Sequence, residues 1–281
     1  QFNKKQNQNS INLRVDSLNS ISTINFEYNS FVKLYMDSYL IKDQKLISKM
    51  LAISKHYFPI FEQKLDKYNL PLELKYLSVV ESSLNTRAKS PSGALGLWQF
   101  MYPTAKEYGL RVTSYIDERL DPFKSTEAAC KYFIKLYDLF GDWNLVLAAY
   151  NGGPGYIQRK MISTGYDNYW DLRPHLRTET RNYVPKFIAI TYLMEFHKNY
   201  KFPIDTLDIT LLNSDTIQID YQINYKILSK LTCLSEEDIS YYNPSFKNNI
   251  VPKGSTIVLP KSNIDDYYLN YKEYKVFTQA V

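Results

Sequence analysis

The chain has 281 residues, of which 44% are hydrophobic and 22% charged, and its net charge is +5. These values are ordinary for a soluble globular protein, and the length suits one larger domain followed by a smaller one. The basic residues are scattered, which argues against a nucleic-acid-binding arm, and no apolar stretch is long enough to predict a transmembrane helix. Two cysteines, Cys130 and Cys233, exclude a disulfide framework, and we expect both to be buried free thiols.

The first three quarters of the chain predict a mainly α-helical protein. Residues 1–30 are polar, and we expect a flexible or partly extended lead-in there. Apolar residues then recur at helical spacing through residues 31–203, which predicts one helical domain. Helix boundaries, or a kink in the case of the last, are expected at Pro71, Pro122, Gly141, Asp142, Gly152 and Pro185.

After Pro203 the pattern changes to alternation with a period of two, which is typical of strands. We expect residues 204–265 to form a small α+β module and residues 266–281 to begin a further, truncated repeat. The strands are expected at 205–212, 215–223 and 255–260, with helices at 225–231 and 235–242.

Glu81 is the first candidate for catalysis. It continues the apolar stripe of Leu70, Leu74 and Leu77 and lies near the expected end of its helix. Burial and the helix dipole both raise the pKa of a carboxyl group placed there. A carboxyl group that stays protonated near neutral pH is suited to general acid catalysis on a glycosidic oxygen. The alternative is a structural glutamate at a fraying helix end.

The residues after Glu81 have the composition of a sugar-binding loop. Ser90, Gly93 and Gly96 predict tight turns, and Gln99 lies between the bulky side chains of L-W-Q-F. Apolar walls with a few amide and hydroxyl groups are what a sugar site requires. A core aromatic cluster is the alternative, although it leaves the polar Gln99 unexplained.

Four ordered sequence blocks give a more specific indication. They are Glu81-Ser82 followed by A-K-S-P-S-G-A-L-G-L-W-Q-F-M, then D-E-R-L-D-P-F-K-S, L-A-A-Y-N-G-G-P-G and E-T-R-N-Y-V-P. In this order they resemble the lytic transglycosylases of the soluble (SLT) type, most closely the membrane-bound lytic murein transglycosylase D family. The resemblance implies a lysozyme-like helical catalytic domain of the goose type.

The resemblance also implies roles for individual residues. Glu81 would be the catalytic acid/base, and the other site residues would bind substrate. Ser90 and Gln99 would contact the sugar near the scissile bond, and Met101 would pack beside it. Tyr150 would orient Glu81 or the substrate N-acetyl group, and Asn151 would support the loop. The rim of the site would hold Glu179, Arg181 and Tyr183.

The implied reaction is non-hydrolytic cleavage of the β-1,4 bond between N-acetylmuramic acid and N-acetylglucosamine, with 1,6-anhydromuramic ends as the product. No second carboxylate is evident within the first block, which is consistent with one glutamate that acts as acid and then as base. We expect Asp117, Glu118 and Asp121 to serve as helix caps and in ion pairs. A goose-type hydrolase and a non-catalytic peptidoglycan-binding protein remain the alternatives, and a nucleic-acid binder is a distant third.

Residues 216–260 resemble a LysM repeat, although Q-I-N-Y-K-I-L replaces the usual start of the module. Two roles stay open for it, sugar binding and a structural spacer that docks on the catalytic domain. We expect peptidoglycan strands as the partner, no nucleic acid, no cofactor or metal, a monomer, and a place in the bacterial envelope, in the periplasm. A lipid anchor on the precursor, with attachment to the outer membrane, stays open.

Overall fold

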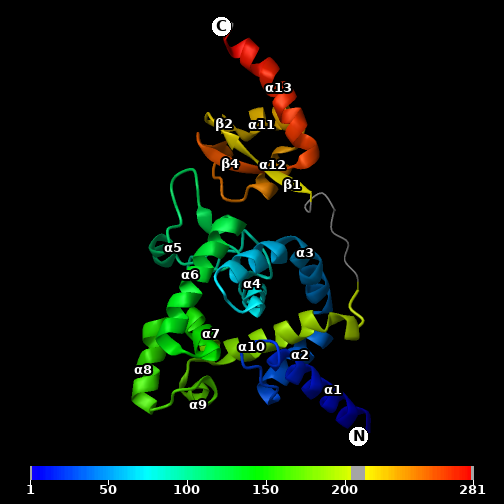
Figure 1. Ribbon diagram of the computed structural model, residues 1–281, viewed down its shortest axis with the longest axis vertical. Helices are drawn as coiled ribbons and strands as arrows, with labels where there is room; N and C mark the ends of the chain where they lie inside the picture. Colours follow the sequence, from blue (N-terminus) through cyan, green and yellow to red (C-terminus); the bar gives the residue numbers. More distant parts are fainter. Residues whose placement is uncertain (1, 204–212, 280–281) are drawn as a thin grey trace. The chain divides into compact units, whose positions relative to one another are not determined.

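The computed structural model describes residues 2–203 and 213–279, which form two compact units (Figure 1). The first unit combines residues 2–84 with 126–203, and the second combines residues 85–125 with 213–279. The prediction of a mainly α fold followed by a small α+β module is confirmed. Within the described residues, no helix is long and apolar enough to cross a membrane.

The first unit is built around the long helix α10 (Thr178–Glu195), which packs against α2, α4 and α7 (Figure 1). Apolar side chains lie on all sides of α10 and are buried, as expected for a helix enclosed by others. Its other elements are α1 (Phe2–Asn19), α2 (Ser30–Ile41), α3 (Gln44–Lys67), η1 (Leu72–Leu74), α4 (Lys75–Ser82), most of α6 (Pro122–Phe140), α7 (Trp143–Gly152), α8 (Pro154–Thr164), α9 (Tyr169–Leu172), η3 (Arg173–His175) and η4 (His197–Asn199).

Most of the expected helix boundaries are confirmed. α6 begins at Pro122 and stops before Gly141, whose φ of 62° few other residues adopt. Asp142 caps α7 by accepting a hydrogen bond of 2.7 Å from the amide of Leu145. Of the two places expected for Pro185, the first turn is wrong, because Pro185 lies in the interior of α10.

Residues near the N-terminus differ from the expected lead-in, because Phe2–Asn19 form helix α1. The helix is polar overall, yet Ile11, Val15 and Leu18 fall at i, i+4 and i+7 and are buried. Tertiary burial of this one narrow stripe outweighs the polar composition on which the expectation rested.

The second unit contains two short antiparallel sheets and the helices around them. Strands β1 (Ser214–Ile219) and β4 (Ser255–Pro260) pair with Ile217 opposite Ile257, and β2 (Ile223–Asn224) pairs with β3 (Ile250–Val251). The remaining elements are α5 (Tyr102–Glu107), η2 (Glu118–Leu120), α11 (Tyr225–Thr232), α12 (Glu236–Tyr242) and α13 (Lys261–Gln279). The helices expected at 225–231 and 235–242 and the strand at 255–260 are confirmed; the strand expected at 205–212 lies outside the described residues.

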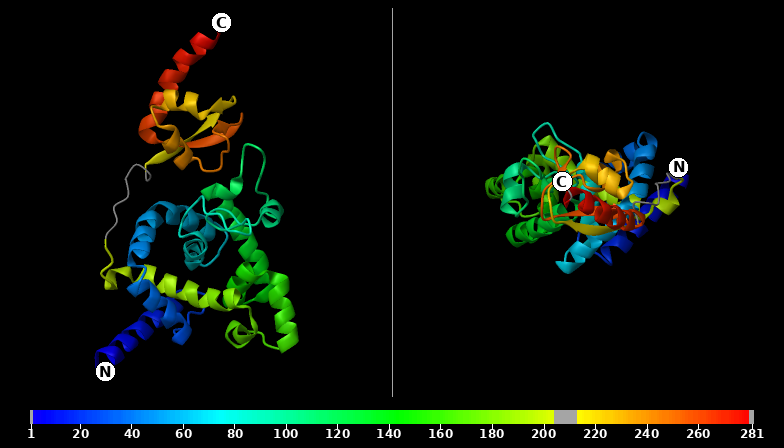
Figure 2. Two further views of the ribbon diagram at one scale, coloured as in Figure 1. Left: turned by 180° about the vertical axis from the view of Figure 1, so that it is seen from behind. Right: turned by 90° about the horizontal axis from the view of Figure 1, so that it is seen from above.

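The C-terminal residues form helix α13, whereas the start of a further, truncated repeat was expected at residues 266–281. Helix α13 contacts α11, β1 and β4, and Figure 2 shows it from a second side. Ile264, Tyr267 and Tyr271 lie on one face of α13 and pack against the buried core of the module. The ring of Tyr271 also stacks on Tyr221 at 5.3 Å. Of the two cysteines, Cys130 is buried as expected, whereas Cys233 is exposed after α11.

Candidate active site

Glu81 lies in the last turn of α4 and is half-buried. The apolar face that it continues is buried through Leu74 and Leu77, and the helix ends at Ser83 in the left-handed conformation (φ 52°). Burial raises the pKa of Glu81 from its usual 4.5 to about 7. The shift has the direction that the sequence predicts, and it favours the protonated acid more than an exposed carboxyl group would.

Two groups on α10 oppose the effect of burial on Glu81. The Tyr183 hydroxyl donates a hydrogen bond to Glu81 Oε1, and the positive charge of Lys186 acts on the same carboxylate, so both lower the pKa of Glu81. Lys186 is itself half-buried, its Nζ lies 3.4 Å from the carbonyl oxygen of Val80, and burial lowers its pKa. The acid is thus held where either protonation state is accessible.

Tyr150 borders the same carboxylate from α7. Burial raises its pKa well above the usual value, and the charge of Glu81 adds to the effect. The same two causes act on Tyr183. Both phenols therefore stay protonated and can serve as hydrogen-bond donors. The Tyr150 ring packs against Tyr132 and Phe133, with centroids 5.3 Å away in each case.

A further group of polar residues ties the end of α7 to the start of α10. Asn151 Oδ1 accepts a hydrogen bond of 3.0 Å from Thr180 Oγ1, and Asn151 Nδ2 lies 3.4 Å from Glu179 Oε1. Glu179 is exposed, and its charge raises the pKa of Glu81 slightly. Arg181 is half-buried, and its backbone carbonyl accepts from the Tyr169 hydroxyl at 2.7 Å.

The first unit thus brings together Glu81, Tyr150 and Tyr183, with Asn151 and Glu179 paired beside them on α7 and α10. Tyr183 differs from the expected rim position, because it is buried and bonds Glu81 directly. The sequence analysis did not identify Lys186 as a site residue. Glu179, Tyr183 and Lys186 follow i, i+4 and i+7, so helical spacing alone could have indicated a shared face of α10.

Ser90, Gln99 and Met101 belong to the second unit. Ser90 Oγ accepts from the amide of Ala94 at 2.9 Å and so stabilises a turn. Gln99 adopts a left-handed backbone (φ 48°), and its Nε2 donates to the carbonyl oxygens of Ala88 (3.0 Å) and Gly96 (2.9 Å). Met101 is 41% exposed at the start of α5. The amide oxygen of Gln99 has no protein hydrogen bond among the described residues and can accept one from a ligand.

The loop that carries Gln99 is closely packed on its own unit. Trp98 and Leu97 are fully buried, so these two side chains form core and not the open wall of a sugar site. A Cβ atom on Gly96 would lie 2.0 Å from the carbonyl oxygen of Arg119, and Gly96 has a φ of 86°. This position therefore requires glycine for both space and conformation.

The buried acids that follow this loop are paired, as predicted. Asp117 accepts from the Arg119 amide and forms an ion pair with its guanidinium. Glu118 pairs with Arg111 and Lys124, both at 2.6 Å. Burial acts to raise the pKa of Glu118, but the bonds from Lys124 and Arg111 lower it below the usual value. No cluster of three His, Cys, Asp or Glu side chains suited to a metal ion occurs in the described part of the chain.

Two models of known protein families match this chain. Residues 58–172 match the family model of the Transglycosylase SLT domain. Residues 213–276 match the model of the LysM-like domain of lytic transglycosylase MltD. The resemblance drawn from the motifs, to the SLT type and to an MltD-type LysM-like module, is therefore confirmed over these residues.

Individual relatives carry different names. Membrane-bound lytic murein transglycosylase D of Escherichia coli K12 is 30% identical over 207 residues, which cover 71% of this chain and 45% of that protein. A putative tributyltin chloride resistance protein of an Alteromonas strain is 35% identical over 109 residues, 38% of this chain and 53% of that protein. The chain thus spans about half the length of these relatives. The 70 kDa soluble lytic transglycosylase of E. coli aligns with a TM-score of 0.43 and 24% identity over 54% of this chain and 26% of that one.

Proposed function

We propose that this protein is a peptidoglycan lytic transglycosylase that cleaves the β-1,4 bond between N-acetylmuramic acid and N-acetylglucosamine and leaves 1,6-anhydromuramic ends. The observation that carries this proposal is the single carboxyl group of Glu81, whose pKa is raised to about 7 by burial while Tyr183 and Lys186 stabilise its ionised form. Such a group can give a proton in one step and take one in the next.

In the proposed reaction, the Glu81 carboxylic acid protonates the glycosidic oxygen, and the bond from the anomeric carbon to that oxygen breaks. The substrate's own N-acetyl group stabilises the positive anomeric carbon. The Glu81 carboxylate then removes the proton from the muramic O6 hydroxyl, whose oxygen forms the new bond to the anomeric carbon. One proton is given and one is recovered, and no water is consumed.

The surrounding residues support each half of this cycle. The Tyr183 hydroxyl donates to the carboxylate and so stabilises the basic form. Tyr150 stays protonated beside Glu81 and would orient the carboxyl group or the N-acetyl group. Ser90, Gln99 and Met101 would bind the sugar, and Asn151, Glu179 and Arg181 would border the site. These roles are proposals that rest on the motif and on the contacts described above.

The products of digestion test the proposal directly. Purified peptidoglycan is digested and the released muropeptides are weighed by mass spectrometry, because anhydro ends are lighter than reducing ends by one water. We expect anhydro products from the wild-type protein and a loss of at least about 100-fold in rate for Glu81→Gln, with Glu73→Gln as the matched control. Reducing ends would instead identify a hydrolase.

Glu179 distinguishes the hydrolytic alternative further, because it is the one other carboxylate in the described chain whose charge acts on Glu81. A hydrolase would need it, or another acid, to activate water. We expect Glu179→Gln to keep anhydro ends as the product. A non-catalytic binding protein would show no cleavage in any variant.

We further propose that the protein acts on peptidoglycan in the bacterial envelope, on the periplasmic side, as a monomer. The matched relatives named membrane-bound lytic transglycosylases support the envelope location. Attachment of the precursor to the outer membrane by a lipid anchor belongs to the same proposal. Cell fractionation of the full-length protein and its mass in solution by light scattering are the tests.

A further inference from the structure

A tight turn of the second unit, residues 113–117, is hydrogen-bonded to the LysM-like module; the bridge of Val112 with Asp117 and the bond from the Thr113 amide to the Ile116 carbonyl oxygen close the turn. Ile116 forms an antiparallel bridge with Phe246. The amide of Asp117 donates to the carbonyl oxygen of Ser245, and the amide of Lys247 donates to that of Tyr115, both at 2.8 Å. Residues 113–117 are therefore joined to residues 245–247 of the module by one isolated β-bridge and two backbone hydrogen bonds.

Side chains of the module strengthen this pairing. Lys247 Nζ donates to the carbonyl oxygen of Thr113 at 2.9 Å, and Asn248 Nδ2 donates to that of Ser114 at 3.2 Å. A second connection lies just before residue 88. Arg87 donates to both oxygens of Ser240 on α12, to the backbone oxygen at 2.6 Å and to Oγ at 2.8 Å. The module is thus bonded to the chain on both sides of residues 88–100, which we call the substrate loop.

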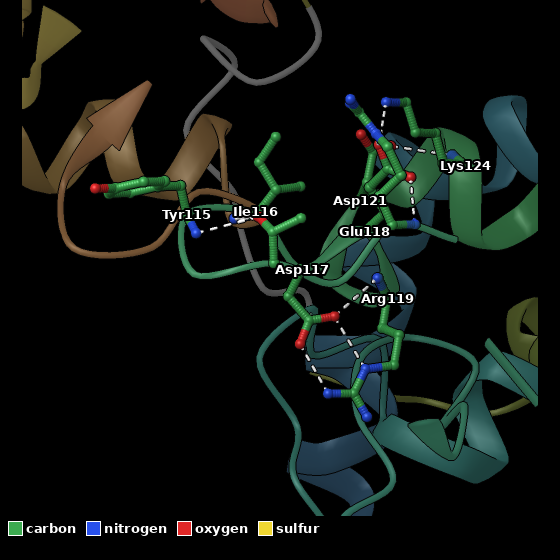
Figure 3. A network of polar contacts seen from close by, with 9 residues as sticks. Tyr115, Ile116, Asp117, Glu118, Arg119, Asp121 and Lys124 are labelled. Atoms are coloured by element: carbon green, nitrogen blue, oxygen red, sulfur yellow. Dashed lines mark hydrogen bonds and ion pairs between the residues drawn. The ribbon is translucent and has the colours of Figure 1, made fainter. Parts of the chain in front are cut away.

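Arg119 connects the paired segment to the substrate loop itself. Its guanidinium binds both carboxylate oxygens of Asp117, at 2.9 and 2.7 Å, and Figure 3 shows the two side chains facing each other. The remaining nitrogen, Nη1, points to the carbonyl oxygens of Gly93 (3.2 Å) and Phe100 (3.4 Å). These two carbonyls lie on either side of Gln99.

Burial makes this connection stiff. The side chains of Asp117 and Arg119 are only 7% and 11% exposed. A bidentate pair of this kind fixes geometry, and removal of one partner would leave a buried charge without compensation. The left-handed backbone of Gln99 must be held by its surroundings. Arg119 contributes by binding one carbonyl oxygen before Gln99 in the sequence and one after it.

We propose that the LysM-like module supports the catalytic step, because through residues 113–117, Asp117 and Arg119 it holds the substrate loop in the conformation that presents Ser90 and Gln99. Asp117 and Arg119 are then positioning residues for the loop. The kinetic part of this inference rests on the proposed function, whereas the structural part does not. The module would thus support the substrate loop, whether or not it also binds glycan.

A matched pair of double variants tests the connection. Lys247→Ala with Asn248→Gly removes both side-chain donors to residues 113–117, and glycine tolerates the left-handed backbone of Asn248 (φ 58°). Lys253→Ala with Asn249→Gly is the control, since Lys253 is exposed and Asn249 has the same left-handed backbone (φ 55°).

Hydrogen–deuterium exchange of the full chain reads out the loop directly. The amides of Ser90, Gly96 and Phe100 donate to Ala94, Ala88 and Leu95 within the loop and report its order. We expect the test variant to exchange these amides about tenfold faster and to turn over peptidoglycan about tenfold more slowly, while the control matches the wild type. Binding to insoluble peptidoglycan should change less than turnover.

Arg119→Lys provides the second variant, because lysine keeps the charge but cannot bind Asp117 and the loop carbonyls together. It should speed exchange in the substrate loop while residues 113–117 stay protected. Unchanged loop exchange in both test variants would overturn the proposal. If the wild-type protein cleaves no glycan but the variants still show faster loop exchange, the module does hold the substrate loop, and only the proposed function is refuted. A module that serves glycan capture alone would lose binding with no change in the loop.

Discussion

At the scale of single residues, the site depends on a balance between opposing effects on one carboxyl group. Burial raises the pKa of Glu81, and the Tyr183 hydroxyl and the Lys186 charge lower it. Neither effect alone would suffice. A carboxyl group with a strongly raised pKa is a weak proton donor, and one with a normal pKa carries no proton to donate at pH 7. The balance near 7 suits a group that must serve in both roles.

Removal of the Tyr183 hydroxyl should shift this balance. Tyr183→Phe abolishes the hydrogen bond to the ionised form of Glu81, so the pKa of Glu81 rises by roughly one unit. The decline of kcat/KM at alkaline pH should move upward by the same amount. Tyr169→Phe is the control, since its hydroxyl bonds the carbonyl oxygen of Arg181 and not Glu81. An unshifted profile in Tyr183→Phe would contradict the assignment.

The raised pKa of Glu81 also has a consequence for stability. Because the folded state binds this proton more tightly than the unfolded chain, stability is lost as the pH rises from the unfolded pKa of about 4.5 through the folded value of about 7. Glu81→Gln removes the cost of ionisation. We expect it to raise the free energy of unfolding by about 1–3 kcal/mol at pH 8 and to leave it unchanged at pH 4. Urea denaturation at the two pH values measures the difference.

The sequence identified Glu81 because helical spacing and motif both point to that position. It did not identify the contacts of Tyr183 or Lys186 with Glu81, because they join α10 to α4 across a long stretch of chain. Spacing along α10 shows which residues share a face, but it does not show what that face meets. Tertiary packing decides that question.

At the scale of elements, local signals predicted helices well wherever a cap or a proline was present. Asp142, Gly141 and Pro122 fix the bounds of α6 and α7 through backbone conformation and hydrogen bonds that are local to the sequence. Helices α1 and α13 were missed because their composition is polar and only a narrow face of each is buried. Such helices owe their stability to packing and not to intrinsic propensity.

The loop after α4 depends on one glycine more than on any side chain. Gly96→Ala combines an unfavourable left-handed φ with a Cβ placed 2.0 Å from the Arg119 carbonyl oxygen. We expect a loss of about 3 kcal/mol or more in the free energy of unfolding, together with loss of glycan cleavage. Gly93→Ala shares the left-handed backbone (φ 89°) but meets no atom, and it should cost only about 1 kcal/mol. Equal losses in both variants would exclude the close approach as the cause.

At the scale of the whole molecule, the units do not follow the order of the chain. The helical domain and the C-terminal module were predictable as separate patterns, because the change of period near Pro203 is local to the sequence. That residues 85–125 join the module could not be predicted, since the bonds of residues 113–117 to Ser245, Lys247 and Asn248 all involve backbone groups of residues 113–117 and have no sequence signature there.

A substitution in the core of the module should therefore destabilise residues 85–125 as well, because they belong to the same unit. Leu228 is fully buried in that core, and Leu228→Ala should cost about 2–5 kcal/mol. We expect faster hydrogen exchange in residues 85–125 as well as in residues 214–260. Leu269→Ala, at a position 65% exposed on α13, is the matched control and should change neither. Faster exchange confined to residues 214–260 would show that the two segments open separately.

The pairing of residues 113–117 with the module also sets an order of events during synthesis. These residues are synthesised long before Ser245 and Lys247, so the contacts of residues 113–117 with the module cannot form until that part of the chain has been made. Closure of this long-range contact comes late and slowly. The activity proposed for this protein would then arise only once residues 245–248 had been made.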